Sequence, residues 1–349
     1  MELRLNSAAA APAHSGRGLS ANAYAAPVAG YLEELDRRVL AQASEFDPDV
    51  VAYLEYVLGC HGKRLRPTLA LLSGLGTGGI TDNHLDLGII VEMIHLATLV
   101  HDDIMDGASQ RRGQPTAAHR WGAEISVLVG DCLFAHALKL CATRFSQEIS
   151  REISSAVCEV CSGEILQTQR RFDLSLGLDD YMRIIRMKTG ELFRIPCELA
   201  AKLNGAPEPV CAGLRRYGES LGIAYQIYDD ILDLLGTEEE TGKTLGTDLE
   251  RGKITLPLLY LLESVDGAEH EALCESLLHG NGQGDGGSRA IIAMAKERGA
   301  LRRSVDTLRQ TLAACTASLE VLPAGPARES LAQIPASLER AVADLSLRA

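Results

Sequence analysis

Two D-D-x-x-D segments are the strongest chemical signal in this sequence of 349 residues. In each, the first and last carboxylates are four residues apart, so on a helix they project from one face about one turn from each other. Like charges at this spacing repel one another. The carboxylates belong to Asp102, Asp103, Asp106, Asp229, Asp230 and Asp233.

Each acidic segment follows an apolar stretch, residues 96–100 in one case and 223–227 in the other. Uncompensated carboxylates would be costly in such surroundings. Hard carboxylate oxygens that face one another across a helix bundle suit Mg²⁺, which commonly bridges a few carboxylates and the phosphate oxygens of a substrate. A single segment is equally well explained as a solvated helix face, but two copies with apolar approaches predict a metal site.

Basic residues of the kind that grip diphosphate stand near the acidic segments. Lys63, Arg64 and Arg66 lie in the run G-K-R-L-R-P, and Arg111 and Arg112 follow the first acidic segment. Arginine offers a planar fork of donors to phosphate, and lysine a compact charge. Either group alone could be scattered surface charge. Because the sequence has no Gly-rich phosphate loop, we expect side chains and metals to hold any phosphate.

The composition favours a helical globular protein, with 46% hydrophobic, 23% charged and only 4% aromatic residues. A formal net charge of -13 argues against nucleic acid or an anionic membrane as a partner, since both attract clustered Lys and Arg. The longest apolar stretch, residues 87–100, contains Glu92 and His95 and is too short to span a bilayer. We therefore expect an all-α protein without a transmembrane segment.

The cysteines point to a reducing compartment. There are nine of them, an odd number that does not suggest a disulfide framework, so we expect a cytoplasmic protein. Cys158 and Cys161 form a C-x-x-C pair within a helical pattern. Because no second pair accompanies it, this motif does not predict a metal or redox site.

Helical periodicity dominates the chain from about Val28 onward. The clearest apolar runs lie at 51–58, 87–100, 123–140, 153–167, 214–235 and 256–262. Breaks are expected at the Gly and Pro clusters 74–79, 205–209 and 280–287, the last as a mobile surface loop.

The N-terminal residues differ in composition from the rest. Residues 1–27 are rich in Ala and Ser, with Arg4 and Arg17 as the basic residues, which predicts a disordered extension and leaves a transit peptide as the alternative. Residues 28–349 are expected to form one domain.

The order of the motifs resembles the trans-prenyl diphosphate synthase family, the polyprenyl synthetases, from about residue 28 to the end. The matching segments are G-K-R-L-R-P at 62–67, E-M-I-H at 92–95, H-D-D-I-M-D at 101–106, R-R-G at 111–113, V-G-D at 129–131, K-T-G at 188–190, Y-Q-I-Y-D-D-I-L-D at 225–233, G-K-T-L-G-T-D-L at 242–249 and R-G-K-I-T-L-P at 251–257.

This resemblance implies an antiparallel helix bundle of the isoprenoid synthase type around a central cavity, usually as a homodimer, with the two acidic segments facing each other at its mouth. It also implies a magnesium site of about three ions, in which Mn²⁺ can substitute. Asp102, Asp106 and Asp229 would be the ligands, with Asp103, Asp230 and Asp233 supporting them.

The resemblance assigns the remaining site residues as well. Those expected to hold the allylic diphosphate are Arg111, Lys188, Lys243 and Lys253. Those expected to hold isopentenyl diphosphate are Lys63, Arg66, His95 and Arg112. Those expected to line the reacting centre beside the aspartates and Lys188 are Thr189, Tyr225 and Gln226. Alone, His95 would read as a core residue, but it lies seven residues before Asp102 and so on the same helix face.

The implied reaction is the head-to-tail (1′-4) condensation of isopentenyl diphosphate with an allylic diphosphate, giving an all-trans polyprenyl diphosphate. Charge preorganised around the leaving diphosphate would stabilise it as it departs. The carbocation left behind needs a dry, apolar pocket. No side chain is an obvious general base, so the resemblance suggests that the released diphosphate accepts the proton.

Two small residues, Ala97 and Thr98, stand one turn before Asp102, where short-chain members of the family carry bulky aromatics. They resemble the medium-to-long-chain group, hexaprenyl to decaprenyl (about C30–C50), which makes quinone side chains. Close packing against a neighbouring helix would also explain small residues there. A floor deeper in the channel is expected near Leu133 or Phe134.

Three other functions remain open from the sequence. A short-chain synthase making farnesyl or geranylgeranyl diphosphate is one. A terpene cyclase uses similar carboxylates but needs no second diphosphate site, against which the group around Lys63 argues. A non-catalytic regulatory subunit of a heteromeric synthase would usually have eroded acidic segments, whereas both are intact here.

Overall fold

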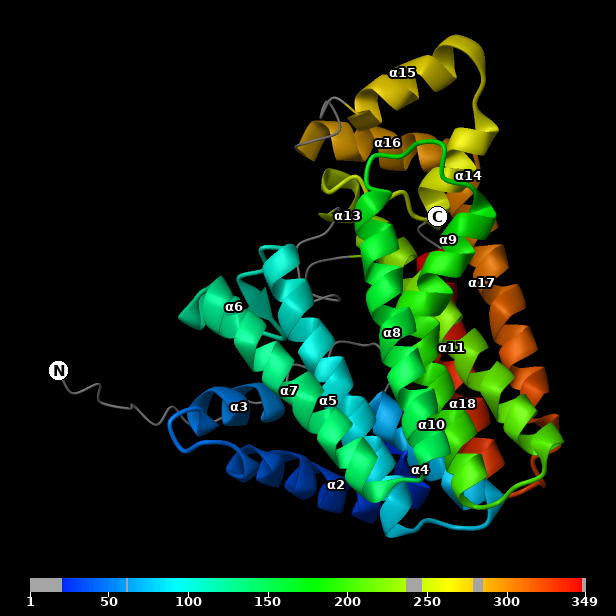
Figure 1. Ribbon diagram of the computed structural model, residues 1–349. Helices are drawn as coiled ribbons and strands as arrows, with labels where there is room; N and C mark the ends of the chain where they lie inside the picture. The colour runs from blue at the N-terminus through cyan, green and yellow to red at the C-terminus, as the bar shows by residue number, and fades with distance from the viewer. Residues whose placement is uncertain (1–20, 61, 237–246, 279–284, 347–349) are drawn as a thin grey trace.

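The computed structural model describes residues 21–60, 62–236, 247–278 and 285–346, and most of them lie in helices packed as a bundle (Figure 1). The strands of the described part are β1 (Gln110–Arg111) and β2 (Gln114–Pro115), which pair as one antiparallel hairpin. The all-α prediction is therefore confirmed.

The first half of the chain supplies one side of the bundle. Its helices are α1 (Ala21–Tyr24), η1 (Ala26–Val28), α2 (Ala29–Ala41), η2 (Gln42–Glu45), α3 (Val51–Leu58), α4 (Leu65–Thr77), α5 (Asp82–Met105), α6 (Ala117–Trp121), α7 (Ala123–Arg144) and α8 (Gln147–Gln169). The long helix α5 begins at a capping box, in which the Thr81 backbone N–H donates to His84 Nδ1 at 3.1 Å.

The second half supplies the other side and one end of the bundle. Its helices are α9 (Leu178–Ile185), the π-helical turn η3 (Arg186–Gly190), α10 (Glu191–Leu203), α11 (Glu208–Leu235), α13 (Thr247–Glu250), α14 (Leu256–Ser264), α15 (Gly267–Leu278), α16 (Asp285–Glu297), α17 (Ala300–Ala317), η4 (Ser318–Val321) and α18 (Pro326–Ser346). Helices α15 and α16 lie together at the top of Figure 1.

Helices α5 and α7 run antiparallel beside each other (Figure 1). At one end Arg144 lies 3.9 Å from Asp86, and at the other the ring of His101 meets the carbonyl of Val127 at 3.1 Å. Helix α5 is buried on nearly every side between residues 87 and 97. This burial explains an apolar run without a polar face.

Helix α10 lies at the centre of the bundle, in contact with α4, α5, α8 and α11. Helix α11 buries residues at intervals of three and four, including Tyr217, Leu221, Ala224 and Ile231. This stripe is the amphipathic pattern of a helix with one face in the core. The core residues form two clusters, one around α4, α5 and α10 and one around α11, α14 and α17.

The six helical runs expected from the sequence all lie within helices, but helices extend into all three expected breaks. Helix α4 continues to Thr77, so only the glycines at 78 and 79 leave it. Residues 280–284 of the expected loop lie outside the described residues, and 285–287 already belong to α16, so the loop prediction is wrong there. The break at 205–209 ends at Pro207, directly before α11.

The packed chain begins earlier than the predicted boundary at residue 28. Tyr24 in α1 is only 1% exposed and Val28 is fully buried, and both belong to the core around α4 and α5. Helix α1 packs against α18, near the other end of the chain. Residues 21–27 therefore belong to the domain, and the rest of the predicted extension lies outside the described residues.

Candidate active site

The first acidic segment lies at the C-terminal end of α5, directly after the buried residues Leu96, Ala97 and Val100. The pKa of Asp102 is raised to about 6, chiefly by burial, with a smaller contribution from the carboxylates of Glu164 and Asp106 and with Lys188 opposing the shift. A carboxyl group with such a pKa lacks sufficient positive charge around it.

Asp103 is buried and bound by Arg111. The guanidinium donates from Nε at 2.8 Å and approaches through Nη2 at 2.7 Å, both to the same carboxylate oxygen. Burial still raises the pKa of Asp103, against the effect of Arg111. Arg111 therefore supports the segment directly, while part of its guanidinium surface stays exposed.

Arg111 and Arg112 diverge because they straddle a tight hairpin. Arg111 closes strand β1, whereas Arg112 and Gly113 form the two-residue loop with φ of 53° and 75°. Positive φ at both loop positions is the type I′ geometry that suits a two-residue hairpin. The guanidinium of Arg112 lies against Gly62, so close that a Cβ on that glycine would fall 2.5 Å from Nη1. One arginine thus serves the acidic segment and the other the G-K-R-L-R-P segment.

The second acidic segment lies near the C-terminal end of α11. Asp230 and Asp233 are buried, at 4% and 2% exposure. Asp230 accepts hydrogen bonds from the Tyr181 hydroxyl at 2.7 Å and from Gln226 Nε2 at 2.8 Å. Burial and the charges of Asp248 and Asp229 nevertheless raise the pKa of Asp230 to about 7. The raised pKa shows that the surroundings of Asp230 favour its neutral form.

Lys253 links the two acidic segments. Its ammonium lies 3.8 Å from Asp106 on the first segment and 3.0 Å from Asp248. The backbone N–H of Asp248 in turn donates to Asp233 of the second segment at 3.2 Å. The two segments, more than a hundred residues apart in the chain, therefore meet around one lysine.

Two arginines add to the positive charge at Asp106. Arg251 lies 2.7 Å from its carboxylate and also donates to its backbone carbonyl, and Arg171 lies 3.9 Å away. Neither arginine was expected from the sequence. Arg251 stands in the R-G-K-I-T-L-P motif next to Lys253, which is a signal for it, whereas nothing local marks Arg171.

The K-T-G segment reaches both sides of the site from the π-helical turn η3. Lys188 is ion-paired with Glu164 and donates to Gln167 Oε1 at 2.8 Å, both on α8. Thr189 donates to Gln226 Oε1 at 2.7 Å, and Gln226 continues to Asp230 of the second acidic segment. The sequence pointed to Lys188, Thr189 and Gln226 but not to their partners on α8.

Among the four residues expected at the isopentenyl diphosphate site, Arg112 is the one whose charge affects the pKa of the other three. Burial lowers the pKa of Arg66 to about 10, with Glu92 opposing and Arg112 reinforcing the shift. Burial together with Arg66 and Arg112 also places the pKa of His95 well below its usual value. Desolvation and Arg112 lower the pKa of Lys63. Crowded cations of this kind form an anion site.

Arg66 offers a donor to such an anion. Its guanidinium lies over the ring of Phe193 at 4.6 Å, and within the described part of the chain its buried Nε meets no hydrogen-bond partner. An unpaired buried donor is costly unless a ligand satisfies it. Arg64 of the same segment instead pairs with Asp36 and Glu92, each at 2.7 Å, and so stabilises the fold.

Apolar and aromatic side chains lie close to the acidic segments and to Arg66. Tyr225 packs its ring 5.6 Å from that of Phe193, and burial raises its pKa to about 12, so it stays neutral. Ala97 is fully buried, and the Thr98 hydroxyl donates back to the His95 carbonyl at 2.8 Å, leaving its methyl group free to pack. Phe134 lies beside His101, with ring centroids 5.8 Å apart, and is therefore level with the acidic segment rather than deeper.

The donor set suits magnesium that is shared with a substrate. Among the described residues, no three His, Cys, Asp or Glu side chains form a closed metal cage by themselves. Mg²⁺ usually binds through one or two carboxylates, and phosphate oxygens and water complete its octahedron. The raised pKa values of Asp102 and Asp230 are what carboxylates arranged for a cation show in its absence. Lys243, expected at the allylic diphosphate, lies outside the described residues.

Comparisons with known proteins agree with the family that the order of the motifs suggests. The sequence model of the polyprenyl synthetase family matches residues 47–292, more than half of the chain. The all-trans-nonaprenyl-diphosphate synthase (geranyl-diphosphate specific) of Rhodobacter capsulatus is 35% identical over 314 residues, which are 88% of this chain and 94% of that protein. Heptaprenyl diphosphate synthase component 2 of Bacillus subtilis is 37% identical over 281 residues, 80% and 79% of the two chains.

A solved structure extends the similarity to the fold. The polyprenyl synthase of Caulobacter crescentus, in complex with calcium and isoprenyl diphosphate, superposes with a TM-score of 0.85 at 32% identity. The match covers 92% of this chain and 98% of that one.

Proposed function

The chain belongs to the polyprenyl synthetase family and is a prenyltransferase, and we propose that it condenses isopentenyl diphosphate with an allylic diphosphate, head to tail, to give an all-trans polyprenyl diphosphate. The observation that carries the assignment is the presence of two separate groups of cations. Arg111 and Lys253 lie close to Asp103 and Asp106 and the charge of Lys188 acts on Asp102, whereas the charges of Arg66 and Arg112 act on His95 and Tyr225. A reaction that joins two diphosphates needs two such groups.

The acidic segments are the proposed magnesium site. Asp102, Asp106 and Asp229 would bind the ions, with Asp103, Asp230 and Asp233 in support. Bound magnesium would supply a Lewis acid for the departing diphosphate. The Caulobacter crescentus structure is a complex with calcium, another divalent cation that prefers oxygen ligands, which supports a divalent site here.

The chain's own residues hold the allylic diphosphate and stabilise its departure. Positive charge acts on each carboxylate of the first acidic segment: that of Lys188 on Asp102, that of Arg111 on Asp103 and that of Lys253 on Asp106. Charge that is already in place when the leaving group departs contributes to the transition state without reorganisation. Tyr225 and Thr189 line the reacting carbon, and because Tyr225 stays neutral it does not present a phenolate to the cation.

The second group of cations orients isopentenyl diphosphate. Arg66 aims an unsatisfied donor, and Arg112 and Lys63 add charge, so one anion can satisfy all three. Holding both substrates by their diphosphates makes a bimolecular step effectively unimolecular. Among the described residues no side chain is an obvious general base, which favours the released diphosphate as the proton acceptor.

We infer a medium-to-long product, within the range of about C30–C50 expected from the sequence. The relatives named above are a heptaprenyl and a nonaprenyl diphosphate synthase, and Ala97 is a small, fully buried residue where short-chain members carry an aromatic ring. Ala97→Phe should shorten the main product by several isoprene units, as sized after dephosphorylation. An unchanged product length would show that the chain does not pass Ala97 and would leave the short-chain alternative open.

We further propose a cytoplasmic homodimer. Among the described helices, α7 is the one long and apolar enough to cross a membrane. It packs along α5, but only 39% of its most apolar stretch is buried, so part of its apolar surface is exposed. Leu128 of α7 and Ile165 of the neighbouring α8 are 59% and 57% exposed. A second copy of the chain would cover these exposed apolar side chains, because exposed apolar patches mark protein–protein interfaces. The name of the Bacillus subtilis relative makes a heteromeric partner the competing occupant.

One assay tests the function. The purified chain is incubated with magnesium, farnesyl diphosphate and radiolabelled isopentenyl diphosphate, and the products are sized. We expect elongation that stops on chelation and resumes when magnesium is restored. Lys63→Ala should abolish the use of isopentenyl diphosphate, whereas a terpene cyclase would keep its activity. Binding of the allylic diphosphate without turnover would favour the regulatory subunit.

A further inference from the structure

The π-helical turn η3 carries the two residues of the K-T-G segment that face the site. It lies between α9 and α10, and the backbone N–H of Glu191 donates to the carbonyl of Arg186, five residues earlier. An α-helix would place this bond four residues back, so the turn contains one extra residue. Such π-turns occur mostly inside α-helices and frequently at functional sites.

The extra residue determines where Lys188 and Thr189 point. Lys188 reaches Glu164 and Gln167 on α8, and Thr189 reaches Gln226 on α11. Both neighbouring helices touch the backbone of the turn. A Cβ on Gly163 of α8 would lie 2.6 Å from the backbone nitrogen of Lys188, and one on Gly222 of α11 would lie 2.8 Å from the Cα of Gly190. With so little space on either side, a change of register would redirect both side chains.

A side-chain pair follows the same five-residue spacing. Arg186 Nη1 lies 3.4 Å from Glu191 Oε1, and these residues stand at the two ends of the turn. Five α-helical residues rotate by about 500°, which leaves two side chains roughly 140° apart around the axis. The π register brings them onto one face. The ion pair between Arg186 and Glu191 is therefore compatible with the π-turn and incompatible with a continuous α-helix.

Glu191 is also ion-paired with Arg194, the first of a series of ion pairs that continues to the buried Glu198. Arg194 donates to Glu191 from Nε at 2.9 Å and from Nη2 at 2.7 Å, and reaches Glu198 at 2.5 Å. Glu198 is also paired with Lys202 at 2.9 Å and with Arg215 of α11 at 2.5 Å.

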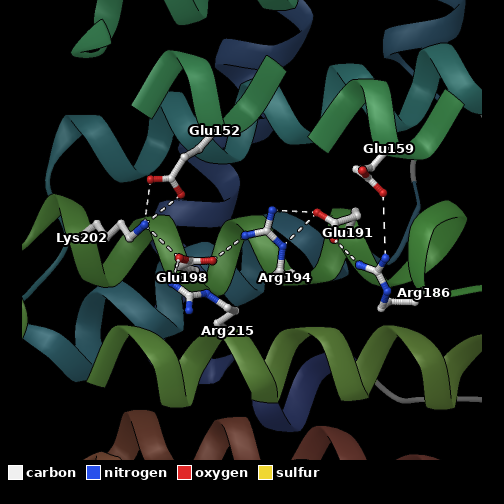
Figure 2. A network of polar contacts seen from close by, with 8 residues as sticks. All are labelled: Glu152, Glu159, Arg186, Glu191, Arg194, Glu198, Lys202 and Arg215. Atoms are coloured by element: carbon white, nitrogen blue, oxygen red, sulfur yellow. Dashed lines mark hydrogen bonds and ion pairs between the residues drawn. The ribbon is translucent and has the colours of Figure 1, made fainter. Parts of the chain in front are cut away.

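Figure 2 shows this charge network across α8, η3, α10 and α11. Its eight residues are Glu152, Glu159, Arg186, Glu191, Arg194, Glu198, Lys202 and Arg215. Within the network, Arg186 also lies 3.9 Å from Glu159 of α8, so it joins the turn to both α8 and α10. The turn is thus tied at its first residue and just after its last.

We propose that the pair of Arg186 and Glu191 locks the π register, and that both are positioning residues for prenyl transfer. Neither residue touches the site itself. They act through Lys188, which must face the allylic diphosphate, and through Thr189, which must face Gln226. The inference rests on the proposed function, because it takes Lys188 to hold the allylic diphosphate.

The test compares Arg186→Ala with Arg215→Ala. Both arginines belong to the charge network, both are paired with a buried glutamate, and their side chains are similarly exposed, at 37% and 39%. We expect Arg186→Ala to raise the KM for the allylic diphosphate and lower kcat, together by roughly tenfold or more in kcat/KM, since small misplacements of positioning groups have effects of this size. The KM for isopentenyl diphosphate should not change. Arg215→Ala should lower the Tm and leave all three constants near those of the parent.

Two further variants guard against a merely structural effect. Arg186→Lys keeps a cation in reach of Glu191 and should recover most of the lost kcat/KM. Glu191→Gln keeps an acceptor for Arg194 but weakens the pair, and should reproduce the kinetic pattern of Arg186→Ala if that variant does not fold. Equal kinetic constants in Arg186→Ala and Arg215→Ala, or an equal rise in both KM values, would overturn the proposal.

Hydrogen exchange gives a readout that does not depend on activity. The peptide containing the Glu191 amide should exchange faster in Arg186→Ala than in the parent, and at the parental rate in Arg215→Ala, because only the first variant loosens the turn. Unchanged exchange in Arg186→Ala would count against the lock. A parent protein that does not elongate prenyl diphosphates would refute the proposed function, while this measurement would still test the register of the turn.

Discussion

The charge network and the acidic segments are two groups of charges in the same bundle, and the pKa values of their buried carboxyl groups are shifted in opposite directions. The network pairs four glutamates with four bases (Figure 2). Burial alone would raise the pKa of Glu198, but hydrogen bonds from Arg215 and Lys202 and the charge of Arg194 lower it to about 2. In the acidic segments, burial instead raises the pKa of Asp102 to about 6 and that of Asp230 to about 7.

The difference shows which group is complete within the chain. Glu198 is 1% exposed and has cations on several sides, so its charge is stabilised by the fold. Asp230 is similarly buried, at 4%, but its neighbours include Asp229 and Asp248. Perturbed carboxyls in a polar site are typical of function, whereas satisfied ion pairs are typical of structure. The first group contacts the turn that carries Lys188, and the second is the proposed magnesium site.

The largest contrast should come from removing one acid from each group. Asp102→Asn should lower kcat by roughly 10³-fold, the effect expected for loss of a preorganised electrostatic contact, while the Tm stays the same or rises because one source of repulsion is gone. Steady-state kinetics and thermal unfolding of the same preparation test this. Full activity, or a large fall in Tm, would remove Asp102 from the metal site.

Glu198→Gln should show the reverse pattern. Removing this charge leaves Arg194, Lys202 and Arg215 without their shared partner, and breaking a buried pair costs about 3–5 kcal/mol. Chemical denaturation should show that loss in the free energy of unfolding, while kcat, measured well below the lowered Tm, stays near that of the parent. If activity falls and stability does not, the network has been assigned the wrong role.

The pH dependence of stability should separate the two groups in the absence of metal. An acid whose pKa is raised by folding destabilises the folded state once the unfolded chain can ionise it, so Asp230 should lower stability as pH rises from about 4 to 7, by on the order of 4 kcal/mol. Glu198 has a lowered pKa, so its contribution is present above about 4.5 and is lost as pH falls toward 2.

Urea denaturation between pH 3 and pH 8 measures both trends. Asp230→Asn should flatten the curve above pH 4 and leave the acid limb unchanged, whereas Glu198→Gln should do the opposite. Adding magnesium should restore the stability lost at neutral pH in the parent but not in Asp230→Asn. A parental curve that rises steadily from pH 4 to 8 would contradict the raised pKa of Asp230.

The smallest contrast should come from salt. Raising NaCl from about 0.1 to 0.5 M shortens the Debye length from roughly 10 Å to about 4 Å. Both KM values should rise a few fold because partly exposed cations attract the diphosphates. The Tm should hardly move because Glu191 and Glu198, the glutamates at the centre of the network, are buried. A fall in Tm as large as that of Glu198→Gln would show that water reaches the network.

The sequence by itself determined the local parts of this protein. Spacings of three and four residues fixed helices such as α3 and α5, and the same spacing placed the aspartates of each acidic segment on one helix face. The order of the motifs indicated the family and most of the site residues. These features depend on neighbours within one or two turns, which are visible in the chain.

Only the tertiary structure decided how those parts are used. Arg64 and Arg66 are two residues apart, yet one pairs with Glu92, whereas the buried Nε of the other has no hydrogen-bond partner among the described residues. Tyr181 and Arg251 reach aspartates 49 and 145 residues away. The π-turn depends on Arg186 meeting Glu191 while two helices press on its backbone. Such contacts arise from packing between distant segments, so no local pattern of residue types reveals them.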